Sequence, residues 1–138
     1  MAGTVIVGYD GSEGGNAALS EAITLASVLS ADLTIVFAYE KVVVGGESHD
    51  LDEAVEEIGE RILAEASATA SGAGISFTTQ YVEGPAAESL ALVAERENAS
   101  YVVVGGTAER PLKAWVLGST ANKLMAIAEC PVVVVRIP

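Results

Sequence analysis

With 138 residues, of which 51% are hydrophobic and 19% charged, the chain is long enough for one domain (residues 1–138) with a single buried core and too apolar for a disordered tail. Its net charge of −12 opposes binding to nucleic acid or to an anionic membrane surface. We expect a cytoplasmic protein, because the apolar runs are too short for a membrane span or a signal peptide and the single cysteine cannot form an internal disulfide.

The first half of the chain alternates strand-length apolar runs with segments of helical period. TVIVG, Thr4–Gly8, is continuously apolar, as in a strand that is covered on both faces. Apolar residues then recur every three or four positions over 16–30, which predicts a helix with one buried stripe. A second strand is expected at Asp32–Tyr39, followed by a polar loop and by a helix over 51–71 with an acidic outer face.

The second half continues the same alternation. ISFTTQYV, 75–82, alternates apolar and polar residues, which predicts a strand at a sheet edge with one face in water. A helix within 83–98, a strand over 101–106, a helix over 119–129 and a strand over 132–137 follow. Strands that alternate with helices, without any hairpin signal, predict an α/β fold with a mostly parallel sheet and helices on both faces.

Sheets of this kind bind ligands beyond the carboxyl ends of their strands, so the loops after strands are the first candidates for a site. The loop GYDGSEGGN places Asp10 just past a strand tip, where a carboxylate can accept hydrogen bonds from ribose hydroxyls or help to hold a phosphate-bound cation. Alternatively, Asp10 and Ser12 only cap the backbone of a local turn. The glycines match neither G-x-G-x-x-G nor a P-loop, which disfavours both of those nucleotide-binding classes.

The loop after the fourth predicted strand begins at Gly105 and ends at Gly118. Its Gly-Ser-Thr end offers backbone amides and hydroxyls to an anion at the positive end of a helix. Residues 98–138 also hold four of the seven bases but two of the 19 acids, which favours an anion near this loop. The alternative is a flexible connection with Ser119 as an ordinary N-cap.

Catalytic and metal-binding motifs are not evident elsewhere. His49 has no second His or Cys at zinc-ligand spacing, and Cys130 has no adjoining basic group to activate its thiol. Ser12 and Ser119 lack a nearby base for nucleophilic catalysis. We therefore expect no catalytic residues.

Three stretches, in order, resemble the universal stress protein family: VIVGYDGSEGGNAAL, VEGPAAESL, and VVVGG with VLGSTANKL and AECPVVVVR. Together they extend over essentially the whole chain. The resemblance implies an open, Rossmann-like sheet of five parallel strands in the order 3-2-1-4-5, similar to adenine nucleotide alpha hydrolases. It also implies one of two classes, because some members of the family bind ATP and others do not.

Members that bind ATP are similar in carrying G-x-x-G-x9-G-[ST]. The resemblance places Gly105, Ala108 and Gly118 at the three glycine positions and Ser119 at the hydroxyl, so Ala108 departs from the pattern. If that position needs a positive φ, alanine costs about 1–2 kcal/mol. The residues that the resemblance implies for binding ATP with Mg²⁺ are Gly8, Tyr9, Asp10 (near ribose and metal), Ala38 (adenine, through its backbone), Val104, Gly105, Ala108, Gly118, Ser119 and Thr120.

Two functions remain open at this point. One is an ATP-binding regulatory module of the stress response, in which the nucleotide orders the loop 106–117 and is hydrolysed slowly at most. The other is an interaction protein of the same fold that binds no nucleotide; a third, an enzyme, is disfavoured. In either case we expect a homodimer, because the apolar strand 132–137 would be an open edge that a second copy can pair with. The alternative is an edge that Arg136 and Pro138 protect.

Overall fold

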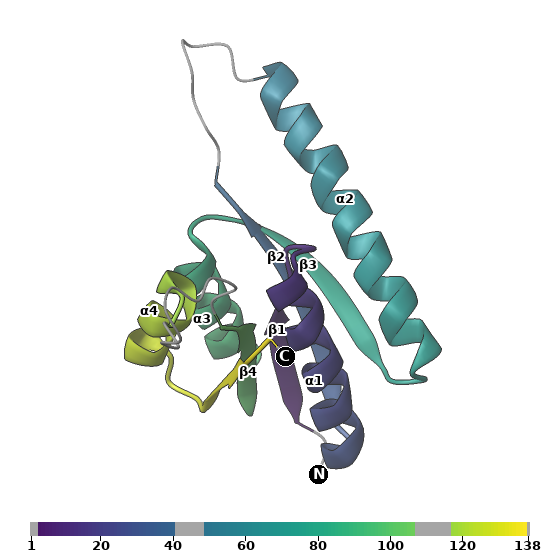
Figure 1. Cartoon of the computed structure of the whole chain (residues 1–138), viewed down its shortest axis with the longest axis vertical. Coiled ribbons are helices and arrows are strands. Elements are labelled where there is room, and N and C mark those ends of the chain that lie inside the picture. The colour runs from purple at the N-terminus through teal and green to yellow at the C-terminus, as the bar shows by residue number, and fades with distance from the viewer. Residues whose placement is uncertain (1–2, 41–48, 107–116, 138) are drawn as a thin grey trace.

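The computed structural model of the chain describes residues 3–40, 49–106 and 117–137. It contains one five-stranded sheet in the order β3-β2-β1-β4-β5, in which every neighbouring pair is parallel, and this confirms the predicted fold (Figure 1). The strands are β1 Thr4–Gly8, β2 Asp32–Tyr39, β3 Phe77–Glu83, β4 Tyr101–Gly105 and β5 Val132–Val135, and the helices are α1 Glu13–Leu29, α2 His49–Gly72, α3 Ala86–Arg96 and α4 Ser119–Ile127.

The central strands separate two hydrophobic cores. Val5 and Val7 of β1 and Val103 of β4 pack with α1 and α2 on one face, whereas Ile6 and Val102 pack with α3 and α4 on the other (Figure 1). All five side chains are completely buried. The strands therefore read as unbroken apolar runs, because both faces of the sheet are covered by helices.

Several elements begin or end away from the predicted positions. Helix α1 begins at Glu13, three residues before the apolar period at 16, because Ser12 caps it with a side-chain hydrogen bond. Its first turn is polar and glycine-rich, so hydrophobic periodicity could not reveal it. Helix α2 begins at His49 rather than at 51, and β5 ends at Val135 rather than at 137.

Within the described ranges, none of the helices is both long and apolar enough to cross a bilayer.

The edge strand β3 carries an aromatic stack under α2. The ring of Tyr81 lies 4.2 Å from that of Tyr39 and 5.4 Å from that of Phe37, measured between centroids, and both pairs are stacked. Gly59 of α2 faces the Tyr81 ring so closely that a Cβ at this position would overlap it. The absence of a side chain at Gly59 thus lets α2 lie against the edge of the sheet.

A direct contact between backbones joins β4 to the start of α1. A Cβ placed on Gly105 would lie 2.6 Å from the carbonyl oxygen of Gly14 and 2.8 Å from its carbonyl carbon. Real Cβ atoms do not approach backbone this closely, so the contact requires glycine at position 105. It holds the N-terminal turn of α1 beside the carboxyl end of β4.

We expect Gly105→Ala to lower the free energy of unfolding by about 1–3 kcal/mol, because the added methyl group must displace backbone. Gly72→Ala is the matched control, since a Cβ there meets nothing within 4 Å and alanine is the better helix former by up to about 1 kcal/mol. Urea unfolding followed by circular dichroism measures both. Equal effects of the two substitutions would contradict the role of the Gly14–Gly105 contact.

Candidate functional site

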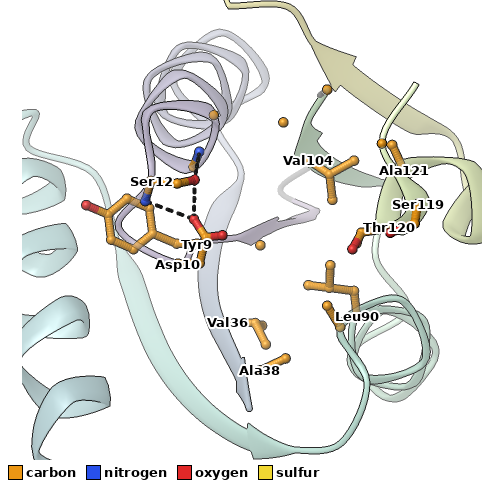
Figure 2. A pocket seen from close by; sticks show the side chains of 17 residues that line it. Tyr9, Asp10, Ser12, Val36, Ala38, Leu90, Val104, Ser119, Thr120 and Ala121 are labelled. Carbon is orange, nitrogen blue, oxygen red and sulfur yellow. Dashed lines mark hydrogen bonds between the residues drawn. The ribbon is translucent and has the colours of Figure 1, made fainter. Parts of the chain in front are cut away.

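The carboxyl ends of β1, β2 and β4 border a hollow of about 270 Å³ (Figure 2). The N-terminal turns of α1 and α4 and one side of α3 complete its lining. The chain leaves β1 toward β2 and leaves β4 toward β5, so this is the position where an open parallel sheet binds its ligands. The lining residues are Gly8, Tyr9, Asp10, Ser12, Gly14, Gly15, Val36, Ala38, Ala86, Leu90, Val104, Gly105, Gly106, Gly118, Ser119, Thr120 and Ala121.

The structure brings nine of the ten predicted binding residues to this one hollow. Ala108, the tenth, lies outside the described residues. The nine come from β1, β2, β4 and α4, which are neighbours in space although they are distant in sequence. They are Gly8, Tyr9, Asp10, Ala38, Val104, Gly105, Gly118, Ser119 and Thr120.

Other lining residues were not predicted as part of the site. Val36 and Ala38 are both on β2 and two positions apart, so strand alternation would have identified Val36 as a neighbour on the same face. Leu90 belongs to the apolar stripe of α3, but nothing in that stripe indicates which of its residues reaches the end of the sheet. Their side chains give the hollow an apolar part beside its glycines and polar groups.

A chain of local hydrogen bonds holds Asp10 at the border of the hollow. The Ser12 backbone N–H and hydroxyl both donate to Oδ1 of Asp10, at 3.0 and 2.5 Å, and the Gly15 N–H donates to the Ser12 hydroxyl oxygen at 3.1 Å (Figure 2). The local-turn interpretation is therefore confirmed for Oδ1. Among the described residues nothing donates to Oδ2, so this oxygen can still interact with a ligand.

Unlike Asp10, Tyr9 lies mostly in the hydrophobic core. The residue is 5% exposed and belongs to the core under α1 and α2, and its hydroxyl donates to Oδ1 of Asn16 at 2.8 Å. Figure 2 shows the ring on the opposite side of Asp10 from Ser119. Burial raises the pKa of the Tyr9 hydroxyl, and the carboxylates of Glu65 and Asp10 raise it further.

The start of α4 is uncapped on the side that faces the hollow. The N-cap is Gly118 and not Ser119, and no side-chain cap bonds the first turn within the described residues. Ser119 and Thr120 occupy that turn, at the border of the hollow (Figure 2). The backbone N–H groups and two hydroxyls are therefore available to an anion at the positive end of a helix.

The charges around the hollow are few. Among the described lining residues Asp10 is the one carboxylate, and none is Lys or Arg. Lys123 is one of the four bases within 98–138 that were expected to favour an anion, and it forms an ion pair with Glu88 that joins α4 to α3. Arg110 and Lys113 lie outside the described residues. In the described part, the helix N-terminus is what can attract an anion.

A model described as the universal stress protein family matches residues 1–136. The chain belongs to the universal stress protein family. The universal stress protein YxiE of Bacillus subtilis is 31% identical to it over 148 residues, which cover 99% of this chain and 100% of the relative.

Solved structures of universal stress proteins agree with this assignment. One from Burkholderia pseudomallei is 29% identical, with a TM-score of 0.78 over 96% of this chain and 94% of that one. Another, determined in complex with cAMP, is 25% identical, with a TM-score of 0.76 over 99% of this chain and 98% of that one. At least one similar universal stress protein thus binds an adenine nucleotide.

We expect alkali to destabilise this universal stress protein through the Tyr9 hydroxyl. Its pKa in the folded state is raised above the ordinary 10.0, so unfolded chain loses the proton first. The contribution to stability is complete below pH 10 and is lost as the pH rises through the folded-state pKa. We expect Tyr9→Phe to cost about 1 kcal/mol at neutral pH, through the lost bond to Asn16.

Because the variant has no hydroxyl to ionise, the difference in stability between the two proteins should shrink between about pH 8 and about pH 11. Urea unfolding at both pH values measures it. Tyr101→Phe in β4 controls for general effects of alkali. If the difference in free energy of unfolding stays constant, the Tyr9 hydroxyl has the same pKa in the folded and the unfolded chain.

Proposed function

We propose that this universal stress protein binds ATP with Mg²⁺ in the hollow and acts as a nucleotide-dependent regulatory module of the stress response. The observation that carries the proposal is the uncapped first turn of α4, which faces the same hollow as the Asp10 carboxylate. The start of α4 can bind the phosphates, and the carboxylate across the cavity can bind their cation. The similar protein that binds cAMP supports an adenine nucleotide as the ligand.

The two sides of the hollow suit different parts of a nucleotide. The phosphates would bind the α4 N-terminus, with Ser119 and Thr120 donating from their hydroxyls. The apolar side formed by Val36, Ala38 and Leu90 suits the base. Asp10, placed by its bonds to Ser12, is the residue that can accept from ribose hydroxyls or coordinate the cation. Bound Mg²⁺ would neutralise part of the phosphate charge.

Because the described lining of the hollow carries few charges, we expect ATP to bind there only together with a cation. Asp10 and a triphosphate repel each other, and no base among the described lining residues offsets this. A divalent ion between them turns the repulsion into attraction. Binding should therefore depend on Mg²⁺ and on the charge of Asp10. Hydrolysis should be slow, because no described lining residue is evidently placed to activate water.

A homodimer is the second part of the proposal. Strand β5 lies at the edge of the sheet, and Val132–Val135 are each only partly buried in the single chain. An apolar edge of this kind is prone to pair with another strand. Two copies related by a two-fold axis can pair their β5 strands antiparallel and bury these valines.

The alternative function is a dimeric interaction protein that binds no nucleotide. The engagement of Asp10 Oδ1 by Ser12 favours it, because the carboxylate already has a structural use in the turn. Ala108, at a position where nucleotide-binding members carry glycine, favours it as well. This alternative predicts no binding of ATP, and the next experiment separates the two.

Isothermal titration of nucleotide-free protein with ATP tests the proposal, with Mg²⁺ and with EDTA. We expect affinity in the micromolar range with Mg²⁺ and at least a tenfold loss, about 1.4 kcal/mol, in EDTA or in Asp10→Asn. Asparagine can keep the acceptor for Ser12 while removing the charge. Ser119→Ala should weaken binding a few-fold, by about 0.5–1.5 kcal/mol, through one lost hydrogen bond.

Glu21→Gln is the matched control for Asp10→Asn, because Glu21 is an exposed carboxylate of α1 that does not line the hollow. It should bind Mg-ATP as the wild type does. No measurable heat up to about 1 mM ATP would refute nucleotide binding and favour the alternative. Equal losses in both variants would mean that net charge, and not the position of Asp10, determines affinity.

The dimer is tested by sedimentation equilibrium of Val133→Asp. A carboxylate in the centre of β5 should raise the dimer dissociation constant by about tenfold or more, because it would be desolvated at the interface. Val28→Asp on α1 is the control, since Val28 is 76% exposed and lies on a different element. Circular dichroism verifies that both variants fold. A monomeric wild type, or a folded Val133→Asp that dimerises normally, would exclude the β5 interface.

A further inference from the structure

A second hollow, of about 550 Å³, lies between α3 and the C-terminal end of α4. It shares no residue with the proposed nucleotide site, and α3 and α4 lie side by side in Figure 1. We call it the α3–α4 groove, and its principal residues are Ala91, Leu92, Glu95, Ile127, Glu129 and Cys130.

The groove exposes large apolar side chains beside small ones. Leu92 and Ile127 are 42% and 40% exposed, although each belongs to a helix that buries other apolar residues in the core. Ala91 and Ala94 also line the groove, and their short side chains take up little of its space. A depression with exposed side chains such as Leu92 and Ile127 is a surface on which a partner can bury apolar side chains of its own.

The rim of the groove is acidic. Glu88 is neutralised by its ion pair with Lys123. The exposed side chains of Glu95 and Glu129 have no ion-pair or hydrogen-bond partner in residues 3–40, 49–106 and 117–137. No Lys or Arg lines the groove within those residues. The groove thus combines exposed apolar side chains with the uncompensated negative charge of Glu95 and Glu129.

We propose that the α3–α4 groove is a docking site for a basic amphipathic helix of a partner protein. Leu92 and Ile127 would contact the apolar face of that helix, while Glu95 and Glu129 would pair with Lys or Arg at its margins. Grooves between packed helices accept amphipathic helices in this way. The acidic rim selects against acidic helices and against anionic membrane surfaces. The proposal does not depend on nucleotide binding.

The probe is a fluorescein-labelled helical peptide of about 14 residues with a leucine face and a lysine face, and fluorescence anisotropy measures its binding. We expect saturable binding in the range of about 1–100 μM at low salt, weakening as salt screens the rim. A peptide with glutamate in place of lysine should not bind. Sedimentation of the free protein is recorded in parallel.

Matched variants locate the binding surface. Leu92→Ser removes apolar contact and Glu95→Lys reverses one rim charge, and each should weaken the peptide about tenfold. Val28→Ser and Glu21→Lys make the same changes on exposed positions of α1, outside the groove. These controls should stay within about twofold of the wild type.

Cys130 provides a second readout without mutation. It is the single cysteine of the chain, lines the groove and is partly buried. Burial raises the pKa of its thiol, and a backbone hydrogen bond opposes this effect without cancelling it. Labelling with a chromogenic disulfide reagent is therefore done at about pH 9, where more thiolate is present. Saturating lysine peptide should slow the labelling about fivefold or more by covering the thiol.

Three results would overturn the proposal. The first is no saturable binding up to about 1 mM peptide. The second is an equal loss of affinity in the α1 controls, which would show general attraction to an acidic chain. The third is a folded Leu92→Ser variant that loses self-association in the absence of peptide, which would make the groove an interface with a second copy of this chain.

Discussion

The close approach of the Gly14 and Gly105 backbones is the constraint on which the candidate site depends. It places the first turn of α1 against the end of β4, so that the loops after β1 and β4 border the same cavity. A side chain at Gly105 would push the two elements apart and open the cavity on that side. Gly105 thus lets backbone approach backbone, and it also lines the cavity.

Helices α1 and α4 both begin at the hollow, but only α1 has a side-chain cap for the unpaired N–H groups of its first turn among the described residues. Ser12 accepts from the Gly15 N–H of α1 and is itself held by Asp10, so the protein supplies a side-chain cap for that start. Gly118 provides no side chain for α4, and a helix start without a cap is stabilised by whatever anion binds there. The asymmetry gives the cavity one side that presents a carboxylate and one that attracts negative charge.

The residues alone predicted a mostly parallel sheet with helices on both faces, because apolar strands that alternate with helical segments are local signals, whereas the strand order came from the resemblance to the universal stress protein family. The glycine-rich loops directed attention to the hollow, and binding there stays a prediction. Sequence reasoning placed the start of α1 too late, since a polar first turn has no hydrophobic period. It could not find Leu90 as a lining residue or the pairing of Lys123 with Glu88, because both depend on how α3 packs in three dimensions. The α3–α4 groove was missed for the same reason: Leu92 and Ile127 are far apart in the chain.

The hydrogen bond from the Gly106 N–H to the Val135 carbonyl, 2.8 Å long, has a wider consequence. It continues the pairing of β4 and β5 beyond the register pair Gly105–Val135, and Gly106 also borders the cavity. A rearrangement that drew Gly106 toward a bound molecule would shorten the ladder and release the tip of the outermost strand. Filling the cavity and recruiting a second subunit would then compete or cooperate through this hydrogen bond, and thermodynamic reciprocity requires that each affect the other equally.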